Sequence, residues 1–227
     1  MRPALPAILS FNAGYVDTAG FLALQGLFTA HVTGNFVTFG AAVALGTTGA
    51  VAKLLALPVF CLVVIGTRLL AYSLEGAGLP VLRAMLILKL LLLTAGAGLA
   101  IRLGPFPDGD AWPAIVTGMV LVSAMAIQNA IHRIHMAGAP PTTLMTGTTT
   151  QIMVDLADLL RGVAPEVAAA VRLRLARMSA SVVAFALGCG AAALAYVLLQ
   201  EWCFAVPPVI ALISTTLSGS STTGAGQ

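Results

Sequence analysis

The chain is built from long apolar stretches that carry almost no charge. A helix needs roughly 20 mainly apolar residues to cross about 30 Å of hydrocarbon. Only 8% of the 227 residues are charged and the mean hydropathy is +1.00, whereas soluble domains carry roughly 25% charged residues. The sequence therefore predicts an all-α polytopic membrane protein. Six stretches approach the length of a crossing: 5–28, 54–75, 80–103, 111–134, 178–199 and 203–217.

Two shorter apolar segments, 33–46 and 146–160, each begin with a Thr-Gly pair. At 1.5 Å per residue such helices are about 21–23 Å long, which is too short to cross. The second segment also contains Asp155 and Asp158. Helices of this kind are tolerated at membrane depth where protein or water surrounds them. We therefore expect six transmembrane helices plus two short re-entrant half-helices.

The basic residues provide a test of this topology. With six crossings, Lys53 and Arg102 lie on one side of the membrane, and the other nine of the eleven basic residues lie opposite. With eight crossings the division is about seven to four, from the same count. The positive-inside rule favours six crossings, with both termini in the cytoplasm. The apolar stretch at 5–28 exceeds a signal-peptide core, so we expect it to be retained.

Several classes of partner are not expected. The net charge is +3, but the basic residues form no stripe with interleaved aromatic residues, so nucleic acid is excluded as a partner. Three cysteines lie in apolar stretches without C-x-x-C spacing, and such cysteines behave as small hydrophobic residues. We therefore predict neither a disulfide, nor a metal site, nor a cofactor.

The two halves of the chain resemble each other. The stretch "VDTAGF…HVTGNFVTFGAAVAL" is similar to "QNAIHR…LMTGTTTQIMVDLADLL". Asp17 precedes Thr33 by sixteen residues, and Asn129 precedes Thr146 by seventeen. Further along, "GTRLLAY" is matched by "GAAALAY". The alternative is that small residues and Thr-Gly pairs recur by chance in a chain rich in alanine, glycine and threonine.

An internal repeat changes the expected architecture. Three crossings separate equivalent elements, so the halves would have opposite orientations, as in many secondary transporters. We expect two inverted repeats of three crossings and one half-helix each, covering residues 1–103 and 111–217. The polar, low-complexity segment at 218–227 is expected to be disordered.

The motifs "GYVDTAGFLALQGLFTAHVTGN", "QNA" and "TTLMTGTTTQIMVDL" resemble the YoaK family of bacterial inner-membrane proteins, whose function is not known. The resemblance covers residues 8–196. The sequence departs from the family pattern at Thr18, where alanine is usual, and at Val32, where methionine is usual. The resemblance implies a six-helix membrane protein with a role in small-molecule transport.

The polar residues of the first motif allow two interpretations. A charged residue at bilayer depth costs a few kcal/mol or more, so we expect Asp17 to face the protein interior. It acts either as a proton- or ion-coupling carboxylate, or as a structural residue bonded to backbone at a helix break. His31 either relays protons to Asp17 or is an ordinary interfacial histidine.

The other candidate residues suit the binding of a polar or anionic ligand. A helix start exposes free N–H groups and the positive end of the helix dipole, and ordinary N-capping is the alternative. In the second half, an amide pair can both donate and accept hydrogen bonds, which suits either a polar substrate or a link between helices. These residues are Thr33, Gly34 and Asn35 in the first half, and Gln128, Asn129, Thr146, Gly147 and Thr148 in the second.

These observations favour a transporter of a small polar or anionic solute, coupled to protons through Asp17 and His31, and not an enzyme. Its expected partners are the solute, membrane lipid and further copies of itself. The first alternative is a membrane-embedded enzyme that uses Asp17, His31 and His132 as acid–base groups. The second is a structural or regulatory membrane protein whose polar residues hold helices together.

Overall fold

The computed structural model describes residues 4–219 of the chain, with side chains described through Leu217. The described residues are mostly helical and contain no β-strand. Most of the tail expected at 218–227 therefore lies outside the described residues. The elements are α1 (Ala4–Ala23), η1 (Val32–Gly34), α2 (Asn35–Leu45), α3 (Ala50–Gly76), α4 (Val81–Leu103), α5 (Trp112–His135), α6 (Met145–Arg161), α7 (Pro165–Leu199), η2 (Gln200–Ala205) and α8 (Val206–Gly219).

The helices follow the apolar stretches closely, with three corrections. The first stretch ends early, because α1 stops at Ala23 and leads into a loop. The stretch expected at 178–199 lies within a longer helix, since α7 begins at Pro165, and proline is well suited to the first position of a helix. The last stretch begins as the 3₁₀-helix η2 before it continues as α8.

Four helical segments of the described chain are long and apolar enough to cross a membrane. The fourth contains α7, η2 and α8. The first helix, α1, is 20 residues long but is not among them, and it carries Asn12 and Asp17 in its interior. The protein is therefore an all-α membrane-type protein. The four segments are Ala50–Gly76, Val81–Leu103, Trp112–His135 and Pro165–Leu217.

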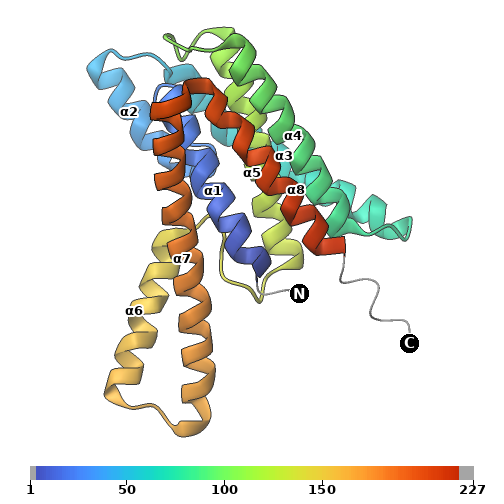
Figure 1. The fold of residues 1–227 in the computed structure, drawn as a ribbon, viewed down its shortest axis with the longest axis vertical. Coiled ribbons are helices and arrows are strands. Elements are labelled where there is room, and N and C mark those ends of the chain that lie inside the picture. Colours follow the sequence, from blue (N-terminus) through green and yellow to red (C-terminus); the bar gives the residue numbers. More distant parts are fainter. Residues whose placement is uncertain (1–3, 220–227) are drawn as a thin grey trace.

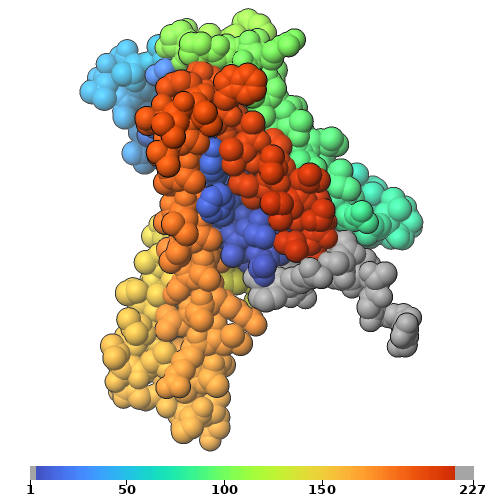
Figure 2. All heavy atoms as spheres, in the orientation of Figure 1, coloured from blue at the N-terminus to red at the C-terminus, as the bar shows by residue number. Residues whose placement is uncertain are grey.

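Two helix pairs form the centre of the bundle. The first helix, α1, packs along α7, while α3 packs along α5. On the side opposite α7, α4 packs against α5 and α8 (Figure 1). Helix α6 pairs with the first half of α7, and this hairpin projects from one end of the bundle (Figures 1 and 2). A compact bundle and a protruding hairpin are thus two distinct regions.

Glycines bring α1 and α7 into backbone contact. A Cβ at Gly14 would collide with the carbonyl oxygen of Phe185, and a Cβ at Gly188 would collide with that of Phe11. Small residues at such a crossing let helices approach closely in membranes. The crossing lies one turn before Asp17 on α1, so it fixes the helix that carries the carboxylate.

Candidate functional site

Asp17 fastens the loop that follows α1. Its side chain is buried, with 4% of the residue exposed. Oδ1 accepts hydrogen bonds from the backbone N–H groups of Thr29 and Ala30, both at 2.7 Å. Oδ2 lies 2.6 Å from Nδ1 of His31. A carboxylate can accept several hydrogen bonds at once, and here one residue holds three consecutive positions of the loop.

His31 is brought directly to Asp17, as the proton-relay interpretation requires. A separation of 2.6 Å is typical of a charge-assisted hydrogen bond. The imidazole packs edge-on against Phe185 of α7, with 5.4 Å between ring centroids. Its second nitrogen, Nε2, forms no hydrogen bond that is found within residues 4–217. One face of the ring is therefore fixed while the other nitrogen stays available.

Asn35 and Gly34 close the same loop. Asn35 accepts a hydrogen bond from the backbone N–H of Phe28 at 2.9 Å and donates one to its carbonyl oxygen at 2.8 Å. The amide thus pairs with Phe28 as a neighbouring strand would. A Cβ on Gly34 would lie 3.1 Å from the Phe28 ring, so glycine leaves room for that ring.

In the second half, a neutral amide does comparable work. Asn129 accepts a hydrogen bond from the hydroxyl of Thr143 at 2.7 Å and donates one to the carbonyl oxygen of Met125 at 3.0 Å. Thr143 belongs to the loop that precedes α6, just as Thr29 belongs to the loop that precedes η1 and α2. The amide therefore fastens a loop to α5 as the carboxylate does to α1.

Gln128 lies behind Asn129 in a buried polar chain. Its Nε2 donates to the carbonyl oxygen of Leu9 at 2.9 Å and to the hydroxyl of Thr142 at 3.1 Å. Its Oε1 accepts a hydrogen bond from Nζ of Lys89, which is completely buried. Gln128 therefore joins α1, α4, α5 and the loop before α6, which suits the interpretation as a link between helices, while its contact with a substrate stays a prediction.

A cavity of about 420 Å³ lies between the first loop, α3 and α5. His31 and Thr33 reach it from the first motif, and Asn129 reaches it from the second half. Two arginines also line it, Arg68 from α3 and Arg133 from α5. This cavity brings together residues from both halves of the chain, although more than ninety positions separate Thr33 from Asn129.

A second cavity, of about 490 Å³, lies between the same loop, α1 and α7. Asp17, Gly34 and Cys189 line it, and His31 lies on its wall as well. His31 is thus shared by both cavities. The loop that carries the first motif therefore lies between the α1–α7 pair and the α3–α5 pair.

The second Thr-Gly motif lies apart from these cavities. Thr146 and Gly147 are exposed, and a Cβ on Gly147 would meet no atom within 4 Å. Thr148 is buried, but its hydroxyl donates to the carbonyl oxygen of Leu144 within its own helix. Of the second half, only Asn129 among the expected residues lines a described cavity.

Sequence reasoning missed the role of Arg68 and Arg133. Both were counted as charges at helix ends, which is what the positive-inside rule requires. A helical spacing argument gives a further signal, because Arg133 follows Asn129 by four residues and therefore shares its helix face. The sequence also gave no reason to single out Asn12, whose two side-chain polar atoms are buried without a partner within residues 4–217.

The protruding hairpin is held by an ion pair. Arg174 of α7 donates to both carboxylate oxygens of Asp155 on α6, at 2.8 and 2.6 Å, and Gln151 donates to one of them at 2.7 Å. These hydrogen bonds, above all those from Arg174, hold the pKa of Asp155 below its usual value. Within residues 4–217, no three His, Cys, Asp or Glu side chains are grouped so as to hold a metal ion.

Comparison with known families supports the resemblance seen in the sequence motifs. The model of the family described as "Protein of unknown function (DUF1275)" matches residues 5–217. The chain belongs to this family. The match covers every helix of the bundle and is consistent with the expected YoaK-like membership. Searches among curated proteins and among solved structures gave no match to this DUF1275 chain.

Proposed function

We propose that the protein is a bacterial inner-membrane transporter of a small polar or anionic solute. The observation that carries this proposal is the cavity shared by His31, Thr33 and Asn129. Ligand sites in membrane transporters lie at the interface of repeats, near the point where helices are interrupted. Here the interrupted segment is the loop between α1 and η1, and both halves of the chain contribute to the cavity that it lines.

The packing of the helices supports an inverted repeat of residues 1–103 and 111–217. In such a repeat α1 corresponds to α5, and α3 corresponds to α7. The packed pair α1–α7 then corresponds to the pair α5–α3, which also packs together. The same exchange of the two halves converts α4–α5 into α8–α1, and α2–α3 into α6–α7, which also pack together. Helices α4 and α8 pack against each other, as elements related by a two-fold axis do. This pattern of contacts favours the repeat over a chance recurrence of Thr-Gly pairs.

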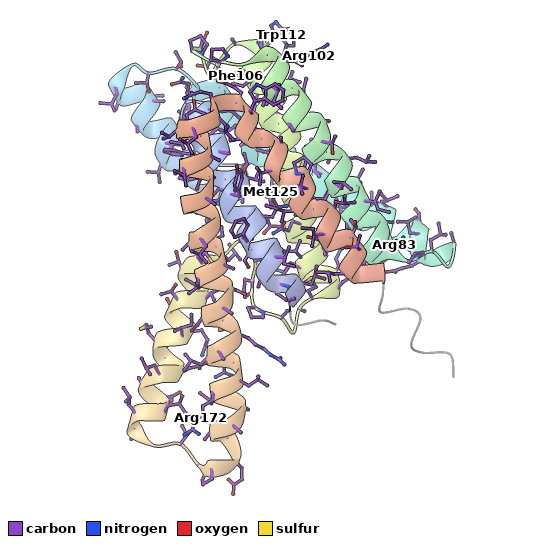
Figure 3. The ribbon with its side chains drawn as sticks, viewed as in Figure 1. Arg83, Arg102, Phe106, Trp112, Met125 and Arg172 are labelled. Carbon is purple, nitrogen blue, oxygen red and sulfur yellow. The ribbon has the colours of Figure 1, made fainter. Side chains whose placement is uncertain are left out.

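Six crossings follow from this proposal, formed by α1, α3, α4, α5, the second part of α7, and η2 together with α8, because the 14 residues of α8 alone are too few to cross. Helix α2 has 11 residues and is therefore about 16 Å long, too short to cross. Figure 3 supports the charge distribution, with Arg102 near one end of the bundle and Arg83 and Arg172 toward the other. We assign the end with Arg83 and Arg172 to the cytoplasm, together with both termini.

The pair of Asp17 and His31 is the candidate for proton coupling. Imidazole is the side chain whose ordinary pKa lies nearest to neutral pH. Because Nδ1 is bonded to the carboxylate and Nε2 is free, the ring can exchange a proton with a cavity while it stays anchored. The same bonds also suit the structural interpretation of Asp17, so a variant must separate the two roles.

A second candidate function is favoured by one observation. Asp17, His31 and Cys189 line the same cavity, and a carboxylate, an imidazole and a thiol are the groups of a nucleophilic enzyme site. However, no hydrogen bond joins His31 to Cys189 within the described residues. Replacing Cys189 with alanine should therefore leave transport intact, whereas it would abolish an enzyme of this kind.

Transport is tested with the full chain in liposomes incubated in a bacterial metabolite extract, with the enclosed solutes measured by mass spectrometry. We expect solutes to be enriched over empty liposomes. Replacing Asn129 with leucine, or Thr33 with valine, should reduce the enrichment. Thr94→Val is the matched control, because Thr94 lies on the exposed side of α4, outside the cavity. Equal contents in protein-containing and empty liposomes would contradict transport.

The topology is tested separately with single cysteines introduced at two exposed positions, one in the loop after α4 and one in the first turn of α4. A cysteine at Asp108 should react with a membrane-impermeant reagent added outside cells, and one at Arg83 should be protected. The reverse pattern would overturn the assignment of the termini. Labelling at both positions from the same side would overturn the six-crossing arrangement.

A further inference from the structure

The cavity between the first loop, α3 and α5 has an unusual balance of charge. Two arginines, the half-buried Arg68 and the exposed Arg133, line it, and no carboxylate lines it among the described residues. Neither arginine forms an ion pair in that part of the chain. Arg68 stacks on the ring of Tyr72 at 4.0 Å, which orients it without neutralising it. Among the described residues the two arginines therefore have no ion-pair partner, and the Asp17 carboxylate behind the lining is bonded to His31.

Topology explains why arginines occur at this end of the helices, but it does not explain why two of them share a cavity. The positive-inside rule is satisfied equally well by Arg83, which is exposed and lies outside the described cavities. A planar guanidinium matches a carboxylate through two parallel hydrogen bonds. An anionic group held between the two arginines would supply the missing charge.

Apart from His31, Thr33 and Asn129, the remaining wall is apolar, and it limits which anion fits. Leu57, Phe60 and Val64 of α3 face Ile134 and Leu144 across the cavity. A small hydrated ion such as phosphate would leave these side chains in contact with water. A sugar would need many hydrogen-bonding partners, whereas the Asn129 amide is already bonded to Thr143 and Met125. The lining therefore favours an apolar body attached to a single anionic group.

From this balance we propose that the cavity binds a small organic monoanion, with its carboxylate or similar group at Arg68 and Arg133 and its apolar body against α3. This deepens the proposed transport function and rests on it for its physiological role. The cavity of about 420 Å³ lies within the range of small-molecule sites, roughly 300–1,000 Å³. The headgroup of an anionic phospholipid has the same chemistry, and the experiment must separate the two sources.

Binding is measured by calorimetry on the full-length protein in neutral detergent, with four probes. Benzoate carries both required features, benzyl alcohol lacks the charge, benzylamine reverses it, and inorganic phosphate lacks the apolar body. We expect benzoate alone to bind. Arg133→Gln and Arg68→Gln should each weaken benzoate binding by about tenfold or more, because a charge-assisted contact is lost. The control Arg83→Gln removes a charge from the same end and should leave benzoate affinity unchanged.

Each other outcome overturns the proposal. Equal binding of benzyl alcohol would show an apolar site without charge selection, and tighter binding of phosphate would show a simple anion site. Unchanged affinity in both cavity variants would place benzoate elsewhere. A further arm adds phosphatidylglycerol: if this lipid binds in an Arg133-dependent way while benzoate does not, the occupant is a lipid.

The outcomes for binding and for transport are separable. Arginine-dependent benzoate binding without uptake of any solute into liposomes would support the ligand class and contradict transport. Uptake of an uncharged or cationic solute that does not depend on Arg68 or Arg133 would support transport and contradict the ligand class.

Discussion

Asp17 and Asn129 perform similar mechanical work with side chains of nearly the same shape and different charge. Asp17 fastens a loop to α1 through two backbone N–H groups and His31, while Asn129 fastens a loop to α5 through one threonine hydroxyl. A neutral amide is therefore sufficient to hold such a loop. The difference indicates that the charge of Asp17 serves its additional partner, the imidazole, which faces both cavities.

The largest expected effect is a loss of stability when the side chain of Asp17, which fastens the loop after α1, is removed. Asp17→Ala leaves the N–H groups of Thr29 and Ala30 without their acceptor in a buried place, and each such loss costs about 1–3 kcal/mol. We expect the free energy of unfolding to fall by about 3 kcal/mol or more. Thermal or denaturant unfolding of the purified protein in detergent measures this. A fall of less than about 1 kcal/mol would mean that the loop is held by other contacts.

Asp17→Asn tests what the charge itself contributes. The amide oxygen can still accept from Thr29 and Ala30, so we expect the fold to survive, as it does around Asn129 in the second half. The charge-assisted bond to His31 is lost. In liposomes, uptake of the solute should respond to an imposed pH gradient in the wild type and not in the variant. Equal responses would exclude Asp17 as the coupling group, and a failure to fold would make it structural.

Asn129 fastens the loop before α6 through fewer hydrogen bonds, so removing its side chain should cause a smaller loss of stability. Asn129→Ala removes one hydrogen bond from Thr143 and one to Met125, and a typical net contribution is about 1 kcal/mol per bond. We expect a fall of about 1–2 kcal/mol in the free energy of unfolding. A double-mutant cycle with Thr143→Val measures the contribution of the hydrogen bond between Asn129 and Thr143. If the two changes are simply additive, the hydrogen bond between these side chains makes no contribution.

Acidic pH should remove a stabilising contribution from the α6–α7 hairpin, namely its ion pair between Asp155 and Arg174. The folded-state pKa of Asp155 lies below its unfolded value, so its ion pair with Arg174 stabilises the protein above that unfolded value, about 3.9. The contribution is lost as pH falls through the folded-state pKa. The melting temperature of Asp155→Asn should therefore lie below that of the wild type at neutral pH, and the gap should close in acid. Asp158→Asn, without a side-chain hydrogen bond among the described residues, is the control.

Much of the fold follows from the length of the apolar stretches, because a helix surrounded by lipid needs a long apolar stretch and little else. One of the two interpretations of His31, the proton relay, also placed it beside Asp17, where the structure has it. The sequence did not predict the meeting of Arg68 and Arg133 in a cavity. Their shared cavity depends on how α3 packs along α5, and two residues that are 65 positions apart carry no local signal of this packing. Nor did equal motifs predict unequal burial, because the surroundings of Gly34 and Gly147 come from other elements.

The smallest effect concerns these two glycines, which the sequence treats as equivalent. A methyl group at Gly34 would lie 3.1 Å from the Phe28 ring, so Gly34→Ala must shift that ring and disturb the loop beside His31. A methyl group at Gly147 would meet no atom within 4 Å, in the exposed first turn of α6. Alanine is favoured over glycine in helices by roughly 0.5–1 kcal/mol.

We therefore expect Gly147→Ala to raise the free energy of unfolding by about 0.5 kcal/mol or less and to leave solute uptake unchanged. Gly34→Ala should lower both quantities, and the pair is compared in the same detergent and liposome assays. Loss of uptake in Gly147→Ala with its stability retained would show that the second Thr-Gly motif contacts solute in another conformation of the protein.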